Sequence, residues 1–325
     1  MANLADVLKQ VNKGKREEDQ TTLLGNKSLV RGVTSTGSVY LDYVSGGGFL
    51  DGGFNEIIAD GGTGKSSVAL LACKDNIKRK KKYAVYFDGE GTVNDSYIDR
   101  MGIDRDMLIV QRGRNLEEML DMAEAFSKAD DVGIIVIDSI AIFVSSVVEA
   151  KSASENSMAV EARKYNQRMP IIEGNCMNRG TTLLGLTSYK LDPGAMGDPR
   201  KLPRGQWQFT MSNTMLELTR KDLILDENKI TIGHVLDARI KKTKNGAFNP
   251  KDVYSVNFYY DGGFNQIEEY ARLFIELELV RQGGAWITYD DYNGEEIKVN
   301  GTSAFIEKIK GDTKLLEHFK KQMYE

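Results

Sequence analysis

A glycine-rich segment between two apolar runs is the part of this chain best suited to chemistry. Residues 56–67 read Glu-Ile-Ile-Ala-Asp-Gly-Gly-Thr-Gly-Lys-Ser-Ser, and an apolar helical pattern follows. A strand, a tight turn and a helix in this order aim backbone N–H groups and the positive end of the helix dipole at one point, where a triphosphate fits. Lys65 would reach the β- and γ-phosphates, and the Ser66 hydroxyl would hold Mg²⁺. The residues predicted to bind the nucleotide are Asp60, Gly61, Gly62, Thr63, Gly64, Lys65, Ser66 and Ser67.

This phosphate loop (residues 59–66) departs from the usual pattern G-x-x-x-x-G-K-[ST] at its first position, where Ala59 replaces glycine. That glycine begins the turn and does not touch phosphate, so we expect the replacement to cost little. A chance glycine turn is a weaker explanation in a chain with 32 glycines, because the strand and the helix are both in place.

Two further apolar runs end in acidic residues. Residues 133–139 contain Asp138 near their end, and residues 84–91 contain Asp88 and Glu90. In a parallel sheet such acids emerge at the carboxyl edge, beside the phosphate loop. Asp138 can therefore hold Mg²⁺ opposite Ser66, directly or through water. Glu90 could polarise the water that attacks the γ-phosphate, although a solvated strand end explains it equally well.

The elements that must position these residues alternate along the chain. Strand patterns lie at residues 84–87, 108–110, 134–137, 182–186 and 214–218, and helical periodicity fills residues 115–129 and 157–169. Strands that are apolar throughout and separated by helices indicate an α/β fold with a mainly parallel sheet covered on both faces. Beyond residue 268 a helix, a strand at 286–289, a turn and a terminal helix predict a small α/β unit.

Composition excludes several classes of protein. The 325 residues, with 41% hydrophobic and 28% charged, are those of an ordinary globular protein. The sequence has no apolar run near the length of a membrane span and no signal-peptide pattern, so we expect a cytosolic protein. Two cysteines and two histidines without metal-ligand spacing argue against zinc. A net charge of −4 argues against a generally basic surface but permits a local cationic strip.

Three segments stand apart from the alternation. Residues 4–11 carry an apolar stripe at helical spacing, so this helix must pack on its own domain or on another subunit. Residues 147–157 have no periodicity, and residues 189–205 hold three of the five prolines. Loops this long in a compact domain are usually functional or disordered.

Several short motifs lie in a fixed order around the phosphate loop. They are Thr-Ser-Thr-Gly-Ser at 34–38, Gly-Gly-Gly-Phe at 46–49, Asp-Gly-Glu at 88–90 and the strand at 134–139. In order and spacing this set resembles the bacterial RecA recombinases and their bacteriophage relatives of the UvsX type. The resemblance implies an N-terminal helix and linker over residues 1–32 for subunit packing. It also implies a RecA-like P-loop ATPase core over residues 33–267 and a small C-terminal α/β domain over residues 268–325.

The resemblance implies roles for individual residues. Glu90 takes the place of the family's catalytic glutamate. Lys242 and Lys244 match cations that reach ATP on the neighbouring subunit, where positive charge stabilises the developing phosphate charge. Without that match, a solvated loop would be the better interpretation of residues 241–244. The further positions implied to contact the nucleotide are Asn94, Tyr97 and Tyr260.

The two irregular segments fall where the family has its two DNA-binding loops. Single-stranded DNA binding needs cations along the phosphates and apolar or aromatic side chains against the bases. The residues so implied are Lys151, Met158 and Arg163 around the first loop, and Lys190, Met196, Arg200, Lys201 and Arg204 in the second. A solvated surface loop without a partner is the alternative, and the cationic cluster at 199–204 favours DNA.

The implied activity is that of a DNA-dependent ATPase that uses ATP and Mg²⁺. Its subunits would form a helical filament on single-stranded DNA and exchange that strand with a homologous duplex, with loading or mediator proteins as further partners. The compact length and the departures below favour a bacteriophage protein that acts in the bacterial cytoplasm.

Departures from the family pattern leave two alternatives open. Thr187 and Ser188 replace an asparagine–glutamine pair that senses the γ-phosphate, Pro170 replaces an arginine near the DNA, and Phe209 and Met215 replace interface cations. One alternative is an ATP-binding paralogue that acts as a recombination mediator without strand exchange. The other is a ring-forming helicase motor on the same core.

Overall fold

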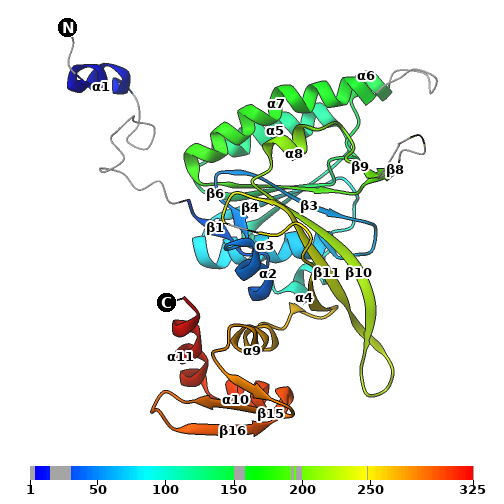
Figure 1. Cartoon of the computed structure of the whole chain (residues 1–325). Helices are drawn as coiled ribbons and strands as arrows, with labels where there is room; N and C mark the ends of the chain where they lie inside the picture. The colour runs from blue at the N-terminus through cyan, green and yellow to red at the C-terminus, as the bar shows by residue number, and fades with distance from the viewer. Residues whose placement is uncertain are drawn as a thin grey trace.

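A large mixed sheet forms the centre of the molecule (Figure 1). The computed structural model describes residues 4–14, 31–149, 158–191, 194, 200–246 and 248–324. Within these residues the sheet has nine strands, in the order β13 (Gly263–Phe264), β12 (Tyr254–Tyr259), β11 (Thr231–Thr243), β10 (Thr214–Leu225), β3 (Gly53–Ala59), β7 (Thr182–Thr187), β6 (Val132–Asp138), β4 (Tyr83–Asp88) and β5 (Leu108–Arg112).

From β10 to β5, neighbouring strands run parallel. Ile57 in β3 lies opposite Leu186 in β7 and Leu216 in β10, and all three side chains are buried. Because these strands are apolar on both faces, layers of helices must cover both. The predicted α/β fold with a mainly parallel sheet is confirmed.

Helices cover the two faces with separate apolar cores (Figure 1). One face packs against α2 (Val39–Ser45), α3 (Lys65–Lys80) and α4 (Asp95–Met101), and the other against α5 (Leu116–Ser127), α7 (Met158–Arg179) and α8 (Trp207–Met211). The short elements are β1 (Val33–Thr34), which pairs with β2 (Phe49–Leu50), the 3₁₀ helix η3 (Arg105–Met107), and α6 (Ser146–Glu149).

Two elements are longer than the sequence pattern predicted. Strand β10 continues past Leu218 to Leu225 and forms a hairpin with β11 whose tip projects from the body of the molecule (Figure 1). Helix α7 continues through Pro170 to Arg179. Proline in a helix interior normally kinks or breaks it, but here Ile172 and Cys176 beyond it are fully buried. Tertiary packing therefore outweighs the local signal.

The C-terminal elements build a small core of their own. These elements are α9 (Gln266–Glu276), β14 (Arg281–Gly283), β15 (Trp286–Asp290), β16 (Glu296–Asn300), α10 (Thr302–Gly311) and α11 (Thr313–Tyr324). The three strands form an antiparallel sheet. Phe319 lies at the centre of this core, with its ring 5.0 Å from Phe274, 5.7 Å from Tyr289 and 6.1 Å from Phe305. The sequence predicted β15 but missed β14 and β16, because their side chains are mostly polar and exposed.

The predicted N-terminal helix is α1 (Leu4–Asn12), and within the described part of the chain none of its side chains is buried. Its apolar stripe, with Leu4, Val7 and Val11, is exposed. None of the helices in the described ranges combines the length and apolar character that a bilayer crossing requires.

Candidate nucleotide site and DNA-facing surface

The phosphate loop joins the end of β3 to the start of α3. Gly62 and Gly64 adopt left-handed backbone conformations, with φ of 73° and 109°. A Cβ atom placed on Gly61 or Gly62 would meet nothing within 4 Å, so this side of the turn is open. Helix α3 begins at Lys65 and directs its free N–H groups into the open space.

A pocket of about 290 Å³ opens over this turn. It is lined by Gly61, Gly62, Gly64, Lys65, Ser66, Ser67, Glu90, Thr92, Tyr97, His234, Phe258 and Tyr260. The pocket therefore brings together the glycine turn, the cation, a carboxylate and three aromatic side chains from distant parts of the sequence.

Ser66 and Asp138 meet at the carboxyl edge of the sheet. The Ser66 hydroxyl donates to Oδ2 of Asp138 at 2.7 Å, and the Tyr86 hydroxyl donates to the same oxygen at 2.6 Å. Oδ1 is buried and has no hydrogen-bond partner among the described residues. Burial raises the pKa of Asp138, while the bonds from Tyr86 and Ser66 lower it. A buried carboxylate oxygen without a partner, beside a hydroxyl, fits the oxygen ligands that Mg²⁺ prefers.

Glu90 forms an ion pair with Lys65. Its Oε1 is 3.7 Å from Nζ of Lys65, and its side chain is 31% exposed. The turn that carries Glu90 is fixed by Asp88, whose carboxylate accepts N–H groups of Gly91 at 2.8 Å and Thr92 at 3.1 Å. A carboxylate that is rigidly held yet reached by water can orient a water molecule near the phosphate.

Tyr97 provides an aromatic wall beside the phosphate loop. Its hydroxyl is hydrogen-bonded to Ser67, and the guanidinium of Arg100 lies 5.6 Å from the ring centre. Asn94 caps α4 by accepting the N–H of Tyr97 at 3.0 Å, so its side chain acts locally and lies outside the pocket lining. Tyr260 lines the pocket, and its hydroxyl accepts from Arg220 at 3.1 Å.

His234 is a pocket residue that sequence reasoning missed. Its Nε2 lies 2.9 Å from the carbonyl oxygen of Thr63 in the phosphate loop. Burial lowers the pKa of His234, which keeps the imidazole neutral near pH 7. His234 shares a buried face of β11 with Leu236 and Ala238. A polar residue at a buried strand position was the available signal, but the strand itself was not predicted.

Lys242 and Lys244 lie away from the pocket in the described single chain. Lys242 is eight residues beyond His234, roughly 25 Å along an extended strand. Its Nζ donates to the carbonyl oxygens of Phe209 at 2.6 Å and Thr210 at 3.1 Å, and burial lowers its pKa. Lys244 is exposed. Neither lysine therefore lines the pocket of its own chain.

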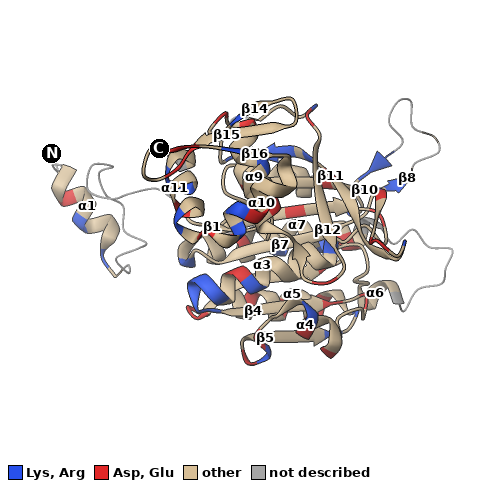
Figure 2. Ribbon diagram, turned by 90° about the horizontal axis from the view of Figure 1, so that it is seen from below, with Lys and Arg blue, Asp and Glu red and all other residues tan. Residues whose placement is uncertain are grey.

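Cations of the second irregular segment gather on a short hairpin of β8 (Lys190–Leu191) and β9 (Arg200–Lys201), as Figure 2 shows. Lys190 and Lys201 are exposed. Arg200 pairs with Glu217 at 2.9 Å and lies 5.1 Å from the ring centre of Tyr189.

The remaining residues predicted to face DNA are placed differently. Arg163 is exposed on α7, whereas Lys151, Met196 and the side chain of Met158 lie outside the described residues.

Arg204 is built into the protein interior. Its side chain is only 7% exposed and forms an ion pair with Glu161, which is 3% exposed. It also donates to the carbonyl oxygens of Ala141 at 2.9 Å and Phe143 at 3.2 Å. These contacts anchor the end of the second irregular segment and hold the guanidinium of Arg204 in the interior, away from the surface predicted to face DNA.

The pair Thr187 and Ser188 connects the phosphate loop with this segment. The Ser188 hydroxyl donates to the carbonyl oxygen of Ala59 at 2.6 Å. Thr187 donates to Oε1 of Gln208 in α8 at 3.0 Å, and Gln208 in turn donates to the carbonyl oxygen of Pro203. These hydrogen bonds, joined by the peptide link between Thr187 and Ser188, connect the start of the phosphate loop with the base of the second segment.

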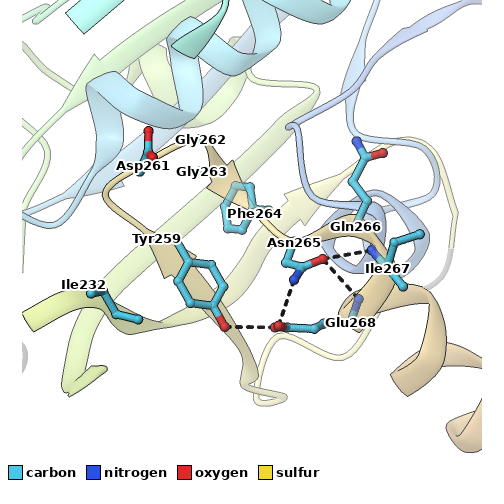
Figure 3. A pocket seen from close by; sticks show the side chains of 10 residues that line it. All are labelled: Ile232, Tyr259, Asp261, Gly262, Gly263, Phe264, Asn265, Gln266, Ile267 and Glu268. Atoms are coloured by element: carbon cyan, nitrogen blue, oxygen red, sulfur yellow. Dashed lines mark hydrogen bonds between the residues drawn. The ribbon is translucent and has the colours of Figure 1, made fainter. Parts of the chain in front are cut away.

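A larger pocket of about 620 Å³ lies where β12 and β13 meet α9 (Figure 3). Three of its polar side chains bond one another: Tyr259 donates to Glu268 at 2.9 Å, and Asn265 donates to Glu268 at 2.8 Å while capping α9. The smaller pocket is the better candidate site, because it holds the phosphate loop and lies beside the unpartnered oxygen of Asp138.

The sequence of this chain is similar to those of known proteins. A family model described as the RecA N-terminal domain matches residues 2–265. Two similar curated relatives, each named Protein RecA, come from Staphylococcus aureus strains JH9 and Newman. Each is 29% identical over 267 residues, which is 82% of this chain and 75% of the relative. Because the family model spans most of the chain and its phosphate loop, the chain belongs to the RecA family.

Proposed function

We propose that this chain is an ATP-dependent recombinase that polymerises on single-stranded DNA and exchanges strands with a homologous duplex. The observation that carries the proposal is the cluster of Lys65, Ser66, Asp138 and Glu90 around one open pocket in a RecA-family chain. Family membership supports a recombinase-like protein, and the geometry supports a nucleotide site.

The residues of the cluster divide the work of ATP hydrolysis. Lys65 and the N–H groups of the glycine turn bind the phosphates and stabilise the charge that develops on them. Ser66 and Asp138 would hold Mg²⁺, which supplies further neutralisation of phosphate charge. Glu90 orients the attacking water and accepts its proton. The products are ADP and phosphate.

The contacts made by Ser188, Thr187 and Gln208 offer a route from nucleotide to DNA. Its far end lies at Pro203, next to the hairpin that carries Lys190 and Lys201. Exposed cations of this kind bind the DNA backbone without reading sequence. ATP would favour the arrangement of the segment that grips DNA, and hydrolysis would release it.

Electron microscopy together with a strand-exchange assay tests the proposal. With ATP, Mg²⁺ and single-stranded DNA, the wild-type protein should form helical filaments and convert homologous duplex. The matched variant Lys65→Ala should do neither. Wild-type protein that stays monomeric on DNA with every nucleotide would overturn the proposal, and rings would favour a helicase motor.

A recombination mediator is the second candidate. Two observations favour it: Ser188, which stands where the family has a longer glutamine, bonds the carbonyl oxygen of Ala59, and the Nζ atom of Lys242 is bound by carbonyl groups of its own chain. A mediator would bind ATP without DNA-stimulated hydrolysis. Hydrolysis rates measured with and without single-stranded DNA separate the two functions.

A further inference from the structure

His234 contacts the phosphate loop directly. Its Nε2 lies 2.9 Å from the carbonyl oxygen of Thr63. A carbonyl oxygen can only accept a hydrogen bond, so Nε2 carries the hydrogen and donates it. Thr63 is followed by Gly64 and Lys65, so this bond holds the turn immediately before the residues that face the phosphates.

The strands around His234 fix the imidazole in place. A Cβ atom on Gly233 would lie 2.3 Å from the carbonyl oxygen of Phe258, so the glycine allows β11 and β12 to approach closely. The rings of Phe258 and Tyr260 lie 5.5 Å and 5.6 Å from the imidazole. The side chain therefore has a fixed position against the turn.

The second ring nitrogen shows that the buried position of His234 lowers the stability of the fold. Nδ1 of His234 is buried and has no hydrogen-bond partner among the described residues, and the residue is only 2% exposed. A buried polar atom without a partner lowers stability, and an apolar side chain of similar size would fill the space without that cost. The bond from Nε2 to Thr63 is the interaction that only a donor at this position can make.

We propose that His234 is a positioning residue for the bound nucleoside triphosphate. Its N–H fixes the carbonyl of Thr63 against β11, so that the turn keeps its following N–H groups facing the phosphates. The inference rests on the proposed function, because it takes the phosphate loop to bind ATP. Loss of the donor frees the turn, so ATP affinity falls. Lys65 and Glu90 remain in place, so turnover of bound ATP is retained.

Three variants of the full chain test this role. His234→Leu removes the donor, and His234→Gln keeps an N–H donor at a similar distance from the backbone. His318→Leu is the matched control, since it makes the same substitution on α11, in the C-terminal unit. The measurements are the Kd for ATP with Mg²⁺ by calorimetry and the KM and kcat of hydrolysis with single-stranded DNA.

We expect His234→Leu to raise Kd and KM about tenfold, equivalent to about 1.4 kcal/mol, with kcat changed less than about twofold. His234→Gln should recover most of the affinity, and His318→Leu should match wild type. Should His234→Leu not fold, as judged by circular dichroism, His234→Phe takes its place.

Wild-type affinity in the variant without a donor would overturn the inference. Equal losses in His234→Leu and His234→Gln would also overturn it, because the effect would then come from packing. If the wild-type protein itself failed to bind ATP, the proposed function would fall first, so the two failures are distinguishable.

Discussion

Replacing Arg204 should destabilise the fold, because its guanidinium makes buried contacts in the protein interior. Arg204→Ala removes the ion pair with Glu161 and the hydrogen bond to the carbonyl oxygen of Ala141. It leaves the Glu161 carboxylate, which is 3% exposed, without its cation. Breaking a buried ion pair from one side costs about 3–5 kcal/mol. Native proteins are typically stable by roughly 5–15 kcal/mol, so the loss is large.

Urea denaturation of the full chain measures this loss as a lower midpoint at an unchanged slope. Lys201→Ala is the matched control, since Lys201 is an exposed cation of the same segment. It should change the unfolding free energy by no more than about 0.5 kcal/mol. Lys201→Ala should instead make single-stranded DNA binding less dependent on salt. The slope of the logarithm of the binding constant against the logarithm of salt concentration should become shallower by about 0.7 for each phosphate that the protein no longer neutralises.

A double variant separates charge from packing. Arg204→Met combined with Glu161→Leu removes both charges, and apolar replacement of a buried pair is often neutral. We expect this variant to recover most of the stability that Arg204→Ala loses. The reasoning is refuted if Arg204→Ala unfolds like wild type and loses salt-dependent DNA binding as Lys201→Ala does.

Three further predictions concern buried or catalytic acids. Glu90→Gln should keep ATP and DNA bound while the hydrolysis rate falls at least about a hundredfold, which a single-turnover assay checks; rapid release of DNA at full turnover would contradict it. Asp138→Asn should raise the Mg²⁺ concentration needed for half-maximal hydrolysis about tenfold or more, and an unchanged Mg²⁺ titration would remove Asp138 from the metal site. Burial raises the pKa of Glu56 to about 8, so the folded state holds a proton that the unfolded chain releases. The contribution of Glu56 to the free energy of unfolding is greatest below the pKa that this group has in the unfolded chain. It is lost as the pH rises toward 8, by about 1.4 kcal/mol per pH unit. Unfolding at pH 5 and pH 8 should show this loss in wild type and much less in Glu56→Gln; equal slopes would disprove it.

The parts of the site that lie in one stretch of chain were predictable. A strand, a glycine turn and Lys65 are adjacent in sequence, and the apolar run before Asp138 places that acid at the carboxyl edge of any parallel sheet. The parallel part of the sheet followed for the same reason, since its strands are apolar throughout.

The rest depends on contacts between distant segments. His234 contacts Thr63, which lies 171 positions away in the sequence. The residues around His234 give no indication of that contact. The sequence does not distinguish Arg204 from the other cations of its basic cluster; only the fold pairs it with Glu161 of α7. Helix α7 passes Pro170 because the residues beyond it are buried against β3 and β7. The domain boundaries at residues 32 and 267 and the similarity to UvsX-type relatives stay predictions.

ATP hydrolysis with and without single-stranded DNA is the measurement that tests the central claim most directly. The phosphate-loop cluster and its connection through Ser188, Thr187 and Gln208 to the second segment predict hydrolysis that DNA stimulates, that high salt suppresses and that Lys65→Ala abolishes. A rate that is the same with and without DNA, or that survives Lys65→Ala, would contradict the account.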